Sequence, residues 1–474
     1  MTSRPDGPNV VLIVLDTARA DVLEPYGGGA GASPVLGDLA RRGAVVRQAT
    51  SPANWTMPSH ASFLTGLLPR SMGLLQVPGG AQSVPAQLAP YADLMLPAVL
   101  QRAGWSTRGV SCNLWVSQLS GFDHGYDEWV DVRTARRAKI LGTSWRERFA
   151  WDVEAAAARV DAGAEQAREV TRRWLAAQPR PFFWFVNLLE CHSPYLPPRP
   201  YNDLGPRVRR QVAREAREHL TLETIWKASL GVREVPADAL SRMRHLYGRS
   251  ILALDAWLGS LLEDLDERKV LDDTLVIVTS DHGENLGESG YMGHCFSLDQ
   301  RLLHVPLVSA GPGAFEGDVV SLSALPSFVA AATGLRDHPY GEPACPPGVA
   351  VAQHDRLTVM GSEEAEGVRV SWDLGELGMR RLTSSQTAVT DGRWKLVDDG
   401  GDEHLYDLAA DPFEVAPLDA AASTAAPTAT LRQLLATARD QQAIATPKPV
   451  ATALAAPAAD VEDLEDRMRL LGYM

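Results

Sequence analysis

The segment LVIVTSDHGE, residues 275–284, carries the clearest structural signal in the chain. Its first half, Leu275–Thr279, is an apolar, β-branched run that predicts a buried strand. An acid and an imidazole, Asp281 and His282, follow where that strand meets a loop. In open α/β sheets, ligands bind outside the carboxyl ends of the strands. The stretch therefore predicts a polar site at one edge of a buried sheet.

A second strand, close to the N-terminus, ends in the same way. The apolar run Val10–Leu15 leads directly into Asp16 and Thr17. Two strands that lie far apart in the sequence thus each deliver an acid to what can be a single sheet edge. This is how a discontinuous metal site is built, so Asp16 and Asp281 are candidate ligands.

Composition limits the classes of partner. The chain has 474 residues, of which 45% are hydrophobic and 22% charged, as expected for a globular protein with a sizeable core. The net charge of −14 and the lack of a long basic stripe argue against nucleic acid as the main partner. A small anionic substrate remains compatible, because a bound cation can invert the local field.

Targeting and redox signals are weak in this sequence. Met1–Pro8 is polar and the apolar run after it is short, so we expect neither a signal peptide nor a membrane partner. The cysteines show no CxxC spacing, and we expect reduced thiols and a cytoplasmic protein. They are Cys112, Cys191, Cys295 and Cys345.

Strand-like and helix-like runs alternate, which predicts βαβ units and a mainly parallel sheet. The expected strands are residues 9–15, 43–49, 106–111, 181–188, 274–279 and 304–309. The expected helices are residues 60–67, 92–103, 151–177, 207–220 and 237–266. We assign residues 1–375 to a catalytic α/β domain, in which the charged range 130–235 is a helical insertion or lid that would set specificity.

The composition and patterning of the sequence change near the C-terminus, and we assign residues 376–474 to a smaller antiparallel subdomain. A hairpin signal, Asp391-Gly392, separates two strand-like runs, and a third run follows it. The three runs are Thr387–Thr390, Trp394–Val397 and Leu405–Leu408. An Ala-, Pro- and Thr-rich segment at 415–458 and an amphipathic terminal helix, Asp460–Leu471, complete the expected subdomain.

Several segments together resemble the sulfatase family of the alkaline phosphatase superfamily. The segment Thr56-Met57-Pro58-Ser59-His60 through Thr65-Gly66 is similar to the family's Cys/Ser-x-Pro-Ser-Arg-x-x-x-x-Thr-Gly signature. The other matching segments are Asn9–Tyr26, Gly121–Asp127, Ser280–Glu284, His304–Leu307, and Lys395-Leu396 with Leu405–Pro412. The resemblance implies an alkaline-phosphatase-like α/β/α sandwich and a divalent metal at the sheet edge.

The position of the family's nucleophile is occupied by Thr56. Sulfatases oxidise the signature Cys or Ser to formylglycine, but threonine carries a methyl group on the carbon that would become the aldehyde. The resemblance therefore implies no formylglycine. Thr56 is what phosphate-handling relatives place here, such as nucleotide pyrophosphatases and phosphoglycerol transferases, in which a cation activates the hydroxyl for in-line attack. His60 stands in place of the signature Arg.

The metal ligands implied by the resemblance are Asp16, Thr56, Asp281 and His282. A second family Asp is replaced by Thr17, so the set is similar to the one-metal sites of phosphonate monoester hydrolases. Mn²⁺, Mg²⁺, Ca²⁺ and Zn²⁺ all suit such oxygen and nitrogen ligands. A second cation, held with the help of His192 and His294, remains an alternative.

Other candidate residues follow from the same alignment. His294 stands where sulfatases often have Lys, and His192 aligns with a His that contacts the transferred group, so both are candidate catalytic residues. Asn113 is a candidate donor to a substrate oxygen. Trp55, which flanks Thr56, and His60 are candidate substrate contacts, and His60 could instead orient Thr56 or replace the signature Arg in packing.

Each candidate also has a structural interpretation. Asp16 and Asp281 could be helix caps, and Thr56 could be a cap or a ligand in a protein that does not catalyse. Ser59 is the nearest rival nucleophile. Arg19 is expected to pair with an internal acid. His124, His245, His304 and Lys395 are expected to lie outside the site.

The sequence thus predicts a metal-dependent hydrolase or transferase that acts on phosphate mono- or diesters through Thr56 and a covalent phospho-enzyme. A formylglycine-independent sulfate-ester hydrolase or sulfuryl transferase is the first alternative. A catalytically silent metal-binding protein is the second. The substrate in either enzyme would be a small-molecule ester, and the oligomeric state stays open.

Overall fold

A computed structural model of the chain describes residues 7–77, 83–132, 145–177, 181–341, 343–356, 362–419 and 427–440. The predicted terminal helix, Asp460–Leu471, lies outside these ranges, as does most of the Ala-, Pro- and Thr-rich segment. No helix in the described ranges combines the length and apolarity needed to cross a bilayer.

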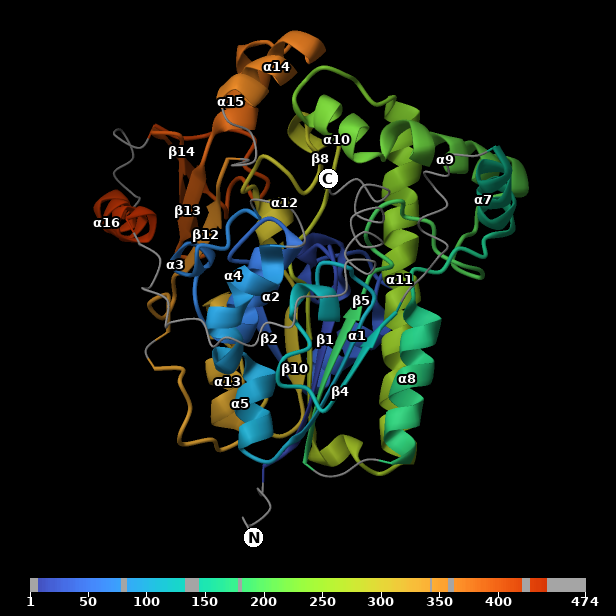
Figure 1. The fold of residues 1–474 in the computed structure, drawn as a ribbon, viewed down its shortest axis with the longest axis vertical. Coiled ribbons are helices and arrows are strands. Elements are labelled where there is room, and N and C mark those ends of the chain that lie inside the picture. Colours follow the sequence, from blue (N-terminus) through green and yellow to red (C-terminus); the bar gives the residue numbers. More distant parts are fainter. Residues whose placement is uncertain are drawn as a thin grey trace.

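A mixed, mainly parallel sheet forms the centre of the molecule (Figure 1). In the described part of the chain it has nine strands in the order β11-β2-β10-β6-β1-β5-β3-β4, with β9 paired to β2. Strand β10 is antiparallel to both of its neighbours, β2 and β6. The strands are β1 Asn9–Leu15, β2 Ala44–Thr50, β3 Ser106–Ser111, β4 Glu128–Asp131, β5 Phe182–Leu188, β6 Thr274–Thr279, β9 His304–Val305, β10 Leu307–Ala310 and β11 Gly317–Ser321.

The central strands are apolar on both faces because helices cover both. In β1, Val11 and Ile13 pack into one core, whereas Val10 and Leu12 pack into the other. This double burial explains why β1, β5 and β6 read as continuous apolar runs without polar alternation. The predicted α/β/α sandwich is confirmed.

Each face of the sheet has its own helical layer. Helices α1 Pro34–Arg42, α8 Ala164–Ala176 and α11 Ala237–Glu267 pack on one face. Helices α2 Thr56–Thr65, α5 Leu96–Arg102 and α13 Leu325–Ala332 pack on the other. Shorter or more peripheral helices are α3 Pro69–Met72, α4 Val84–Leu88, α7 Trp145–Ala157, α9 Pro206–His219, α10 Leu222–Ser229 and α12 Gln300–Leu303.

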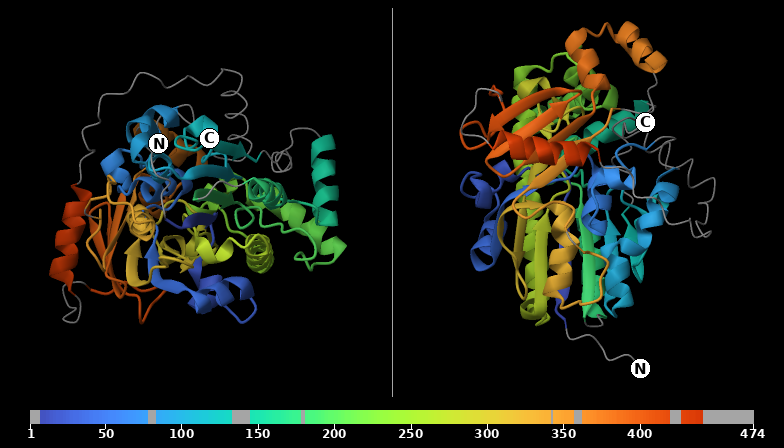
Figure 2. Two further views of the ribbon diagram at one scale, coloured as in Figure 1. Left: turned by 90° about the horizontal axis from the view of Figure 1, so that it is seen from below. Right: turned by 90° about the vertical axis from the view of Figure 1, so that its left-hand side faces the viewer.

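A small antiparallel sheet with the order β12-β13-β14-β15 lies at one end of the large sheet (Figure 2). Helix α16 covers it, with Leu431 and Leu435 packed on Val389 and Leu396. The predicted hairpin is present as β13 and β14, and the third predicted strand is β15. The elements are β12 Ala350–His354, α14 Ser362–Trp372, α15 Glu376–Thr383, β13 Gln386–Thr390, β14 Trp394–Asp399, β15 Asp402–Asp407 and α16 Thr428–Arg439.

Several predicted boundaries differ from the structure for identifiable reasons. The strand expected at 304–309 divides into β9 and β10 at Pro306, which has no N–H to donate to a ladder. The helix expected at 151–177 divides into α7 and α8, and Gly163 with φ 122° precedes the second one. Helix α2 begins at Thr56, four residues before its expected start.

Several short strands were not predicted from the sequence pattern, and two proposed boundaries do not coincide with the elements of the structure. Strands β4, β11 and β12 are short or partly exposed, and we did not predict them. The small sheet begins with β12, ahead of the proposed subdomain boundary at residue 376. The range 130–235 contains β5, which pairs with β1 at the centre of the sheet. Only the parts of that range outside β5 can therefore serve as a peripheral insertion.

Candidate active site

The register of the central sheet brings the two predicted acids together. In the parallel pair β1–β6, Val14 lies opposite Thr279, and each acid follows two residues later. Ligand atoms of Asp16, Asp281 and His282 all lie within 4.8 Å of one another, and all three side chains are fully buried. The predicted edge site therefore joins Asp16, after β1, to Asp281 and His282, after β6, which lie far away in the sequence.

The turn after β1 is strained and held from two sides. Thr17 has φ 64°, which is rare for a β-branched residue. Its amide donates a hydrogen bond to Asp281 Oδ1 at 3.1 Å, and its carbonyl accepts one from the Tyr247 hydroxyl at 2.7 Å. The Ala18 amide donates to Ser280 Oγ at 2.9 Å. These contacts fix the Asp16 turn against the loop after β6.

The His282 ring presents a lone pair to the centre of the site. Its Nδ1 lies 2.9 Å from the Gly283 carbonyl, which can only accept, so the proton is on Nδ1. Its Nε2 lies 3.2 Å from Asp281 Oδ2 and 3.2 Å from Thr56 Oγ1. Burial, and then the charge of His294, lower the pKa of His282 to about 3, so the ring is neutral.

These atoms fit a divalent cation. Asp281 Oδ2 is buried and accepts no hydrogen bond from any described residue. Its lone pairs and that of His282 Nε2 face each other without an intervening proton, which is unfavourable unless a cation lies between them. Burial accordingly raises the pKa of metal-free Asp281 to about 6. Two carboxylates, one imidazole and a hydroxyl are ligands that divalent cations accept.

Thr56 occupies the first position of α2, at the positive end of the helix dipole. Its side chain is almost fully buried, and its Oγ1 faces His282. Asn113 Nδ2 donates to Asp16 Oδ2 at 2.6 Å and lies 3.5 Å from Thr56 Oγ1. The structure therefore brings the candidate nucleophile, the ligand group and Asn113 into one cluster.

Two further imidazoles lie beside this cluster. The His294 ring centroid lies 4.5 Å from that of His282 and 5.2 Å from that of His192. His294 Nδ1 contacts Glu284 Oε1 at 3.0 Å. Burial lowers the pKa of His294, but the charges of Glu284, Asp16 and Asp281 outweigh it, and the net shift is upward.

The family of the chain follows from a comparison with protein-family models. The model described as Sulfatase matches residues 8–334, which include every residue of the cluster described above. The chain belongs to the sulfatase family. Members of this family are ester hydrolases that commonly use a divalent metal, in agreement with the buried ligand group.

Individual relatives and solved structures agree with this assignment. Choline-sulfatase of Rhizobium meliloti is 26% identical over 456 residues, which cover 87% of this chain and 82% of that protein. Human iduronate 2-sulfatase is 23% identical and matches 66% of this chain and 61% of its own length. The crystal structure of phosphonate monoester hydrolase of Agrobacterium radiobacter aligns with a TM-score of 0.64 and 21% identity, over 92% of this chain and 96% of that one. The structural likeness establishes the alkaline-phosphatase-like fold.

Residues around the sulfatase signature have distinct structural partners. His60 is fully buried, with Nδ1 2.9 Å from the Thr56 carbonyl and 3.5 Å from Asp281 Oδ2. Ser59 Oγ donates to the Asp281 carbonyl at 2.7 Å. Trp55 Nε1 donates to the Leu75 carbonyl at 3.2 Å. Contact of His60 or Trp55 with a substrate therefore stays a prediction, whereas the Ser59 hydroxyl has a structural hydrogen bond.

The residues that we expected to lie outside the ligand group have partners elsewhere in the structure. Arg19 pairs with Asp21 at 2.7 Å and with Glu288 at 2.9 Å. Lys395 forms a buried ion pair with Glu414 at 2.6 Å. The side chains of His124 and His245 are 47% and 45% exposed, and both face aspartates at the surface.

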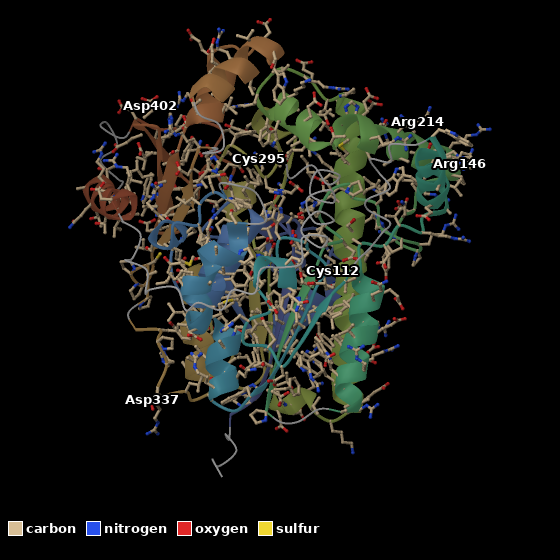
Figure 3. The ribbon with its side chains drawn as sticks, in the orientation of Figure 1. Cys112, Arg146, Arg214, Cys295, Asp337 and Asp402 are labelled. Atoms are coloured by element: carbon tan, nitrogen blue, oxygen red, sulfur yellow. The ribbon has the colours of Figure 1, made fainter. Side chains whose placement is uncertain are left out.

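The cysteines lie outside the nucleophile position. All four are free thiols. Cys112 precedes Asn113 and Cys295 follows His294 in the sequence; Cys112 is buried and Cys295 half-buried, and both are labelled in Figure 3. Burial raises the pKa of Cys295 to about 12, so this thiol is a poor nucleophile at neutral pH.

Sequence reasoning missed several residues that shape the sulfatase site. Glu284 contacts His294, and Tyr247 holds the Thr17 turn from the middle of α11. His354 Nδ1 lies 3.2 Å from Asn54 Oδ1, which places β12 against the loop that precedes Thr56. The sequence did point to Glu284, because this residue follows the candidate ligand His282 by two positions. Tyr247 and His354 had none, because only the tertiary fold brings them near the site.

Proposed function

We propose that this sulfatase-family chain is a metal-dependent hydrolase or transferase of a small anionic ester, with Thr56 as its nucleophile. The observation that supports this proposal most directly is the Thr56 hydroxyl, 3.2 Å from the Nε2 lone pair of a buried ligand group. Asp16, Asp281, His282 and Thr56 would hold a divalent cation such as Mn²⁺, Mg²⁺, Ca²⁺ or Zn²⁺. When bound, the cation would lower the pKa of the hydroxyl and offset negative charge on the ester.

In the proposed reaction, the hydroxyl of Thr56 loses its proton and Oγ1 forms a bond to the sulfur or phosphorus atom. The bond to the ester oxygen breaks, and the leaving oxygen takes up one proton. Water, or an alcohol in a transferase, then displaces the group from Thr56 and restores the hydroxyl. The start of α2 would stabilise negative charge near Oγ1.

Three neighbouring side chains would act on the ester. Asn113 would orient Asp16 and Thr56 and could donate to a non-bridging oxygen. His294 and His192 would bind the transferred group or exchange a proton with the leaving oxygen. The positions of their rings beside His282 support this role.

A sulfate ester is the substrate that the comparisons favour. The matching family model is described as Sulfatase, and the similar proteins from Rhizobium meliloti and from human carry sulfatase names. The match to choline-sulfatase covers 87% of this chain, so the sequence similarity extends well beyond the metal ligands. The enzyme would then act on sulfate esters without formylglycine.

A phosphate mono- or diester is the second candidate, and Thr56 supports it. In a sulfated formylglycine hydrate, the second hydroxyl can lose its proton and form a carbonyl, and the bond between the carbon and the sulfated oxygen then breaks and releases sulfate. Thr56 has one oxygen on Cβ, so its covalent adduct must be resolved by attack on the transferred atom. That route is ordinary for a phospho-enzyme with a cation nearby.

Paired assays distinguish these substrates and a catalytically silent protein. Aryl sulfate, aryl phosphate and bis-aryl phosphate would be tested with the metal-loaded protein and with Thr56→Ala. A ratio of kcat/KM values that favours the sulfate supports the first candidate, and the reverse supports the second. Tight metal binding with no turnover of any ester would instead support a silent metal-binding protein.

A further inference from the structure

Glu284 is a buried acid next to the site that the proposed mechanism does not yet use. Its side chain is 1% exposed, and it lies outside the group of Asp16, Asp281 and His282 whose ligand atoms converge. One oxygen, Oε1, lies 3.0 Å from Nδ1 of His294. A carboxylate can only accept, so it holds the Nδ1 proton of this imidazole.

The backbone forces these two residues to be neighbours. After Glu284 the chain forms a short antiparallel pair, β7 Asn285–Leu286 with β8 Met292–Gly293, in which Asn285 lies opposite Gly293. The next residues outward, Glu284 and His294, therefore face each other across the pair. Gly293 has φ 68°, and a Cβ there would lie 3.0 Å from Ile225 Cγ2, so only glycine suits this position.

The His294 ring is confined on its other sides as well. The His282 ring lies at 4.5 Å between centroids with a tilt of 41°, and the His192 ring approaches at 5.2 Å and 67°. The His294 side chain keeps 13% exposure, whereas those of His60 and His282 keep none. With Nδ1 held by Glu284, Nε2 is the nitrogen left for a ligand.

We infer that Glu284 is a positioning residue that holds Nδ1 of His294, so that Nε2 faces the ester bound at Thr56. The role of Glu284 in catalysis rests on the proposed function, but the fixed orientation and tautomer of the His294 ring do not. Where other sulfatases have Lys, this chain would thus use a carboxylate–imidazole pair. A lysine needs no orienting partner, whereas an imidazole has two distinct nitrogens and needs one.

The first test measures the ring itself and requires no substrate. Two-bond ¹H–¹⁵N spectra, recorded at a pH above the pKa of His294 so that its ring is neutral, distinguish Nδ1–H from Nε2–H imidazoles, and the His294 signals are assigned by their loss in His294→Ala. We expect the Nδ1–H form in the wild type and in Glu284→Gln, whose amide oxygen still accepts. In Glu284→Leu we expect a mixture of tautomers. An unchanged His294 signal in folded Glu284→Leu would overturn the inference.

The second test is a double-mutant cycle. Glu284→Leu should lower kcat by about 10- to 100-fold, as is typical when the partner of a site residue is removed, with KM changed less than about twofold. Glu284→Gln should recover part of this loss. In the His294→Ala background, Glu284→Leu should cause no further loss, because Glu284 acts through His294.

Matched controls separate positioning from general disruption. Asp203→Asn removes a carboxylate that lies 2.7 Å from the Nε2 of another histidine, His245, at the surface. We expect wild-type kcat for this variant.

Additive losses in the double-mutant cycle would overturn the inference that Glu284 acts through His294. If Glu284→Leu does not fold, the comparison of Glu284→Gln with His294→Ala decides: a Gln variant as impaired as His294→Ala contradicts the inference. If no ester is turned over, the proposed function fails and the spectra alone decide.

Discussion

Thr56 Oγ1 and His282 Nε2 lie 3.2 Å apart, although 226 residues separate them in the chain. His282 Nδ1 is committed to the Gly283 carbonyl, so the lone pair on Nε2 points toward the hydroxyl. The buried Asp281 carboxylate lies equally close to the same nitrogen. A hydroxyl, an imidazole lone pair and a carboxylate thus share one small buried space, which defines the site.

The first prediction concerns the cation. Replacing Asp281 with Asn removes a charged ligand while keeping its shape, and His282→Ala removes the imidazole. We expect either change to weaken Mn²⁺ or Zn²⁺ binding by at least about tenfold, measured by isothermal titration calorimetry. Asp203→Asn serves as the control and should bind as the wild type does. Unchanged affinity in both site variants would place the cation elsewhere.

The second prediction concerns pH. Burial raises the pKa of metal-free Asp281 to about 6, above the roughly 3.9 of an unfolded Asp. The protonated acid is therefore favoured in the fold, and the stability it contributes is present below about pH 4 and lost as pH rises through 6. Metal-free wild type should lose stability between about pH 4 and 6, where the folded state binds the Asp281 proton and the unfolded state does not, and Asp281→Asn should lose less.

The same pKa governs metal affinity. A cation requires the carboxylate, so affinity should fall by up to about tenfold per pH unit below 6, when one proton competes for Asp281. Thermal unfolding with and without metal, followed from pH 4 to 8, measures both effects. A metal-induced rise in Tm that is equal at pH 5 and pH 7.5 would contradict this prediction.

The third prediction separates Ser59 from Thr56. The Ser59 hydroxyl donates to the Asp281 carbonyl, and Ser51 Oγ donates to the same oxygen. Ser59→Ala should therefore cost about 1 kcal/mol in the free energy of unfolding, measured by urea denaturation. It should leave covalent turnover intact. Loss of turnover in a stable Ser59→Ala protein would make Ser59 the better candidate for the nucleophile.

The fourth prediction concerns Asn113, whose amide donates to Asp16 and lies near Thr56. Asn113→Ala should lower kcat/KM by about 10- to 100-fold, because it frees a ligand and removes a donor. Binding of the metal should survive, since all four ligand side chains remain. Activity at the wild-type level would show that Asn113 neither orients Asp16 nor contacts the ester.

The sheet and the ligands could be predicted from the sequence because both leave strong local patterns. Strands β1, β5 and β6 are buried on both faces, so each is a continuous apolar run that ends at a polar residue. Asp16 and Asp281 stand directly after such runs, and the parallel register then makes them neighbours. The resemblance to sulfatases supplied Thr56 and the histidines.

The remaining features depend on contacts that no local pattern encodes. The pairing of Glu284 with His294 follows from the register of a two-residue strand pair, which is too short to be recognised in sequence. The approach of His354 to Asn54 joins segments 300 residues apart. Strand β4 lies at the sheet edge with its residues half-buried, so its apolar signal is weak.

The most direct test of the account is the intact mass of the metal-loaded protein during a single turnover. Wild type, Thr56→Ser and Thr56→Ala would each be mixed with an activated aryl sulfate and with an activated bis-aryl phosphodiester, and quenched over time. We predict a transient adduct in the wild type and in Thr56→Ser, of sulfuryl mass with the aryl sulfate or of aryl-phosphoryl mass with the phosphodiester, and none in Thr56→Ala. Turnover by Thr56→Ala at the wild-type rate, or an adduct that persists in it, would contradict the assignment of Thr56 as the nucleophile.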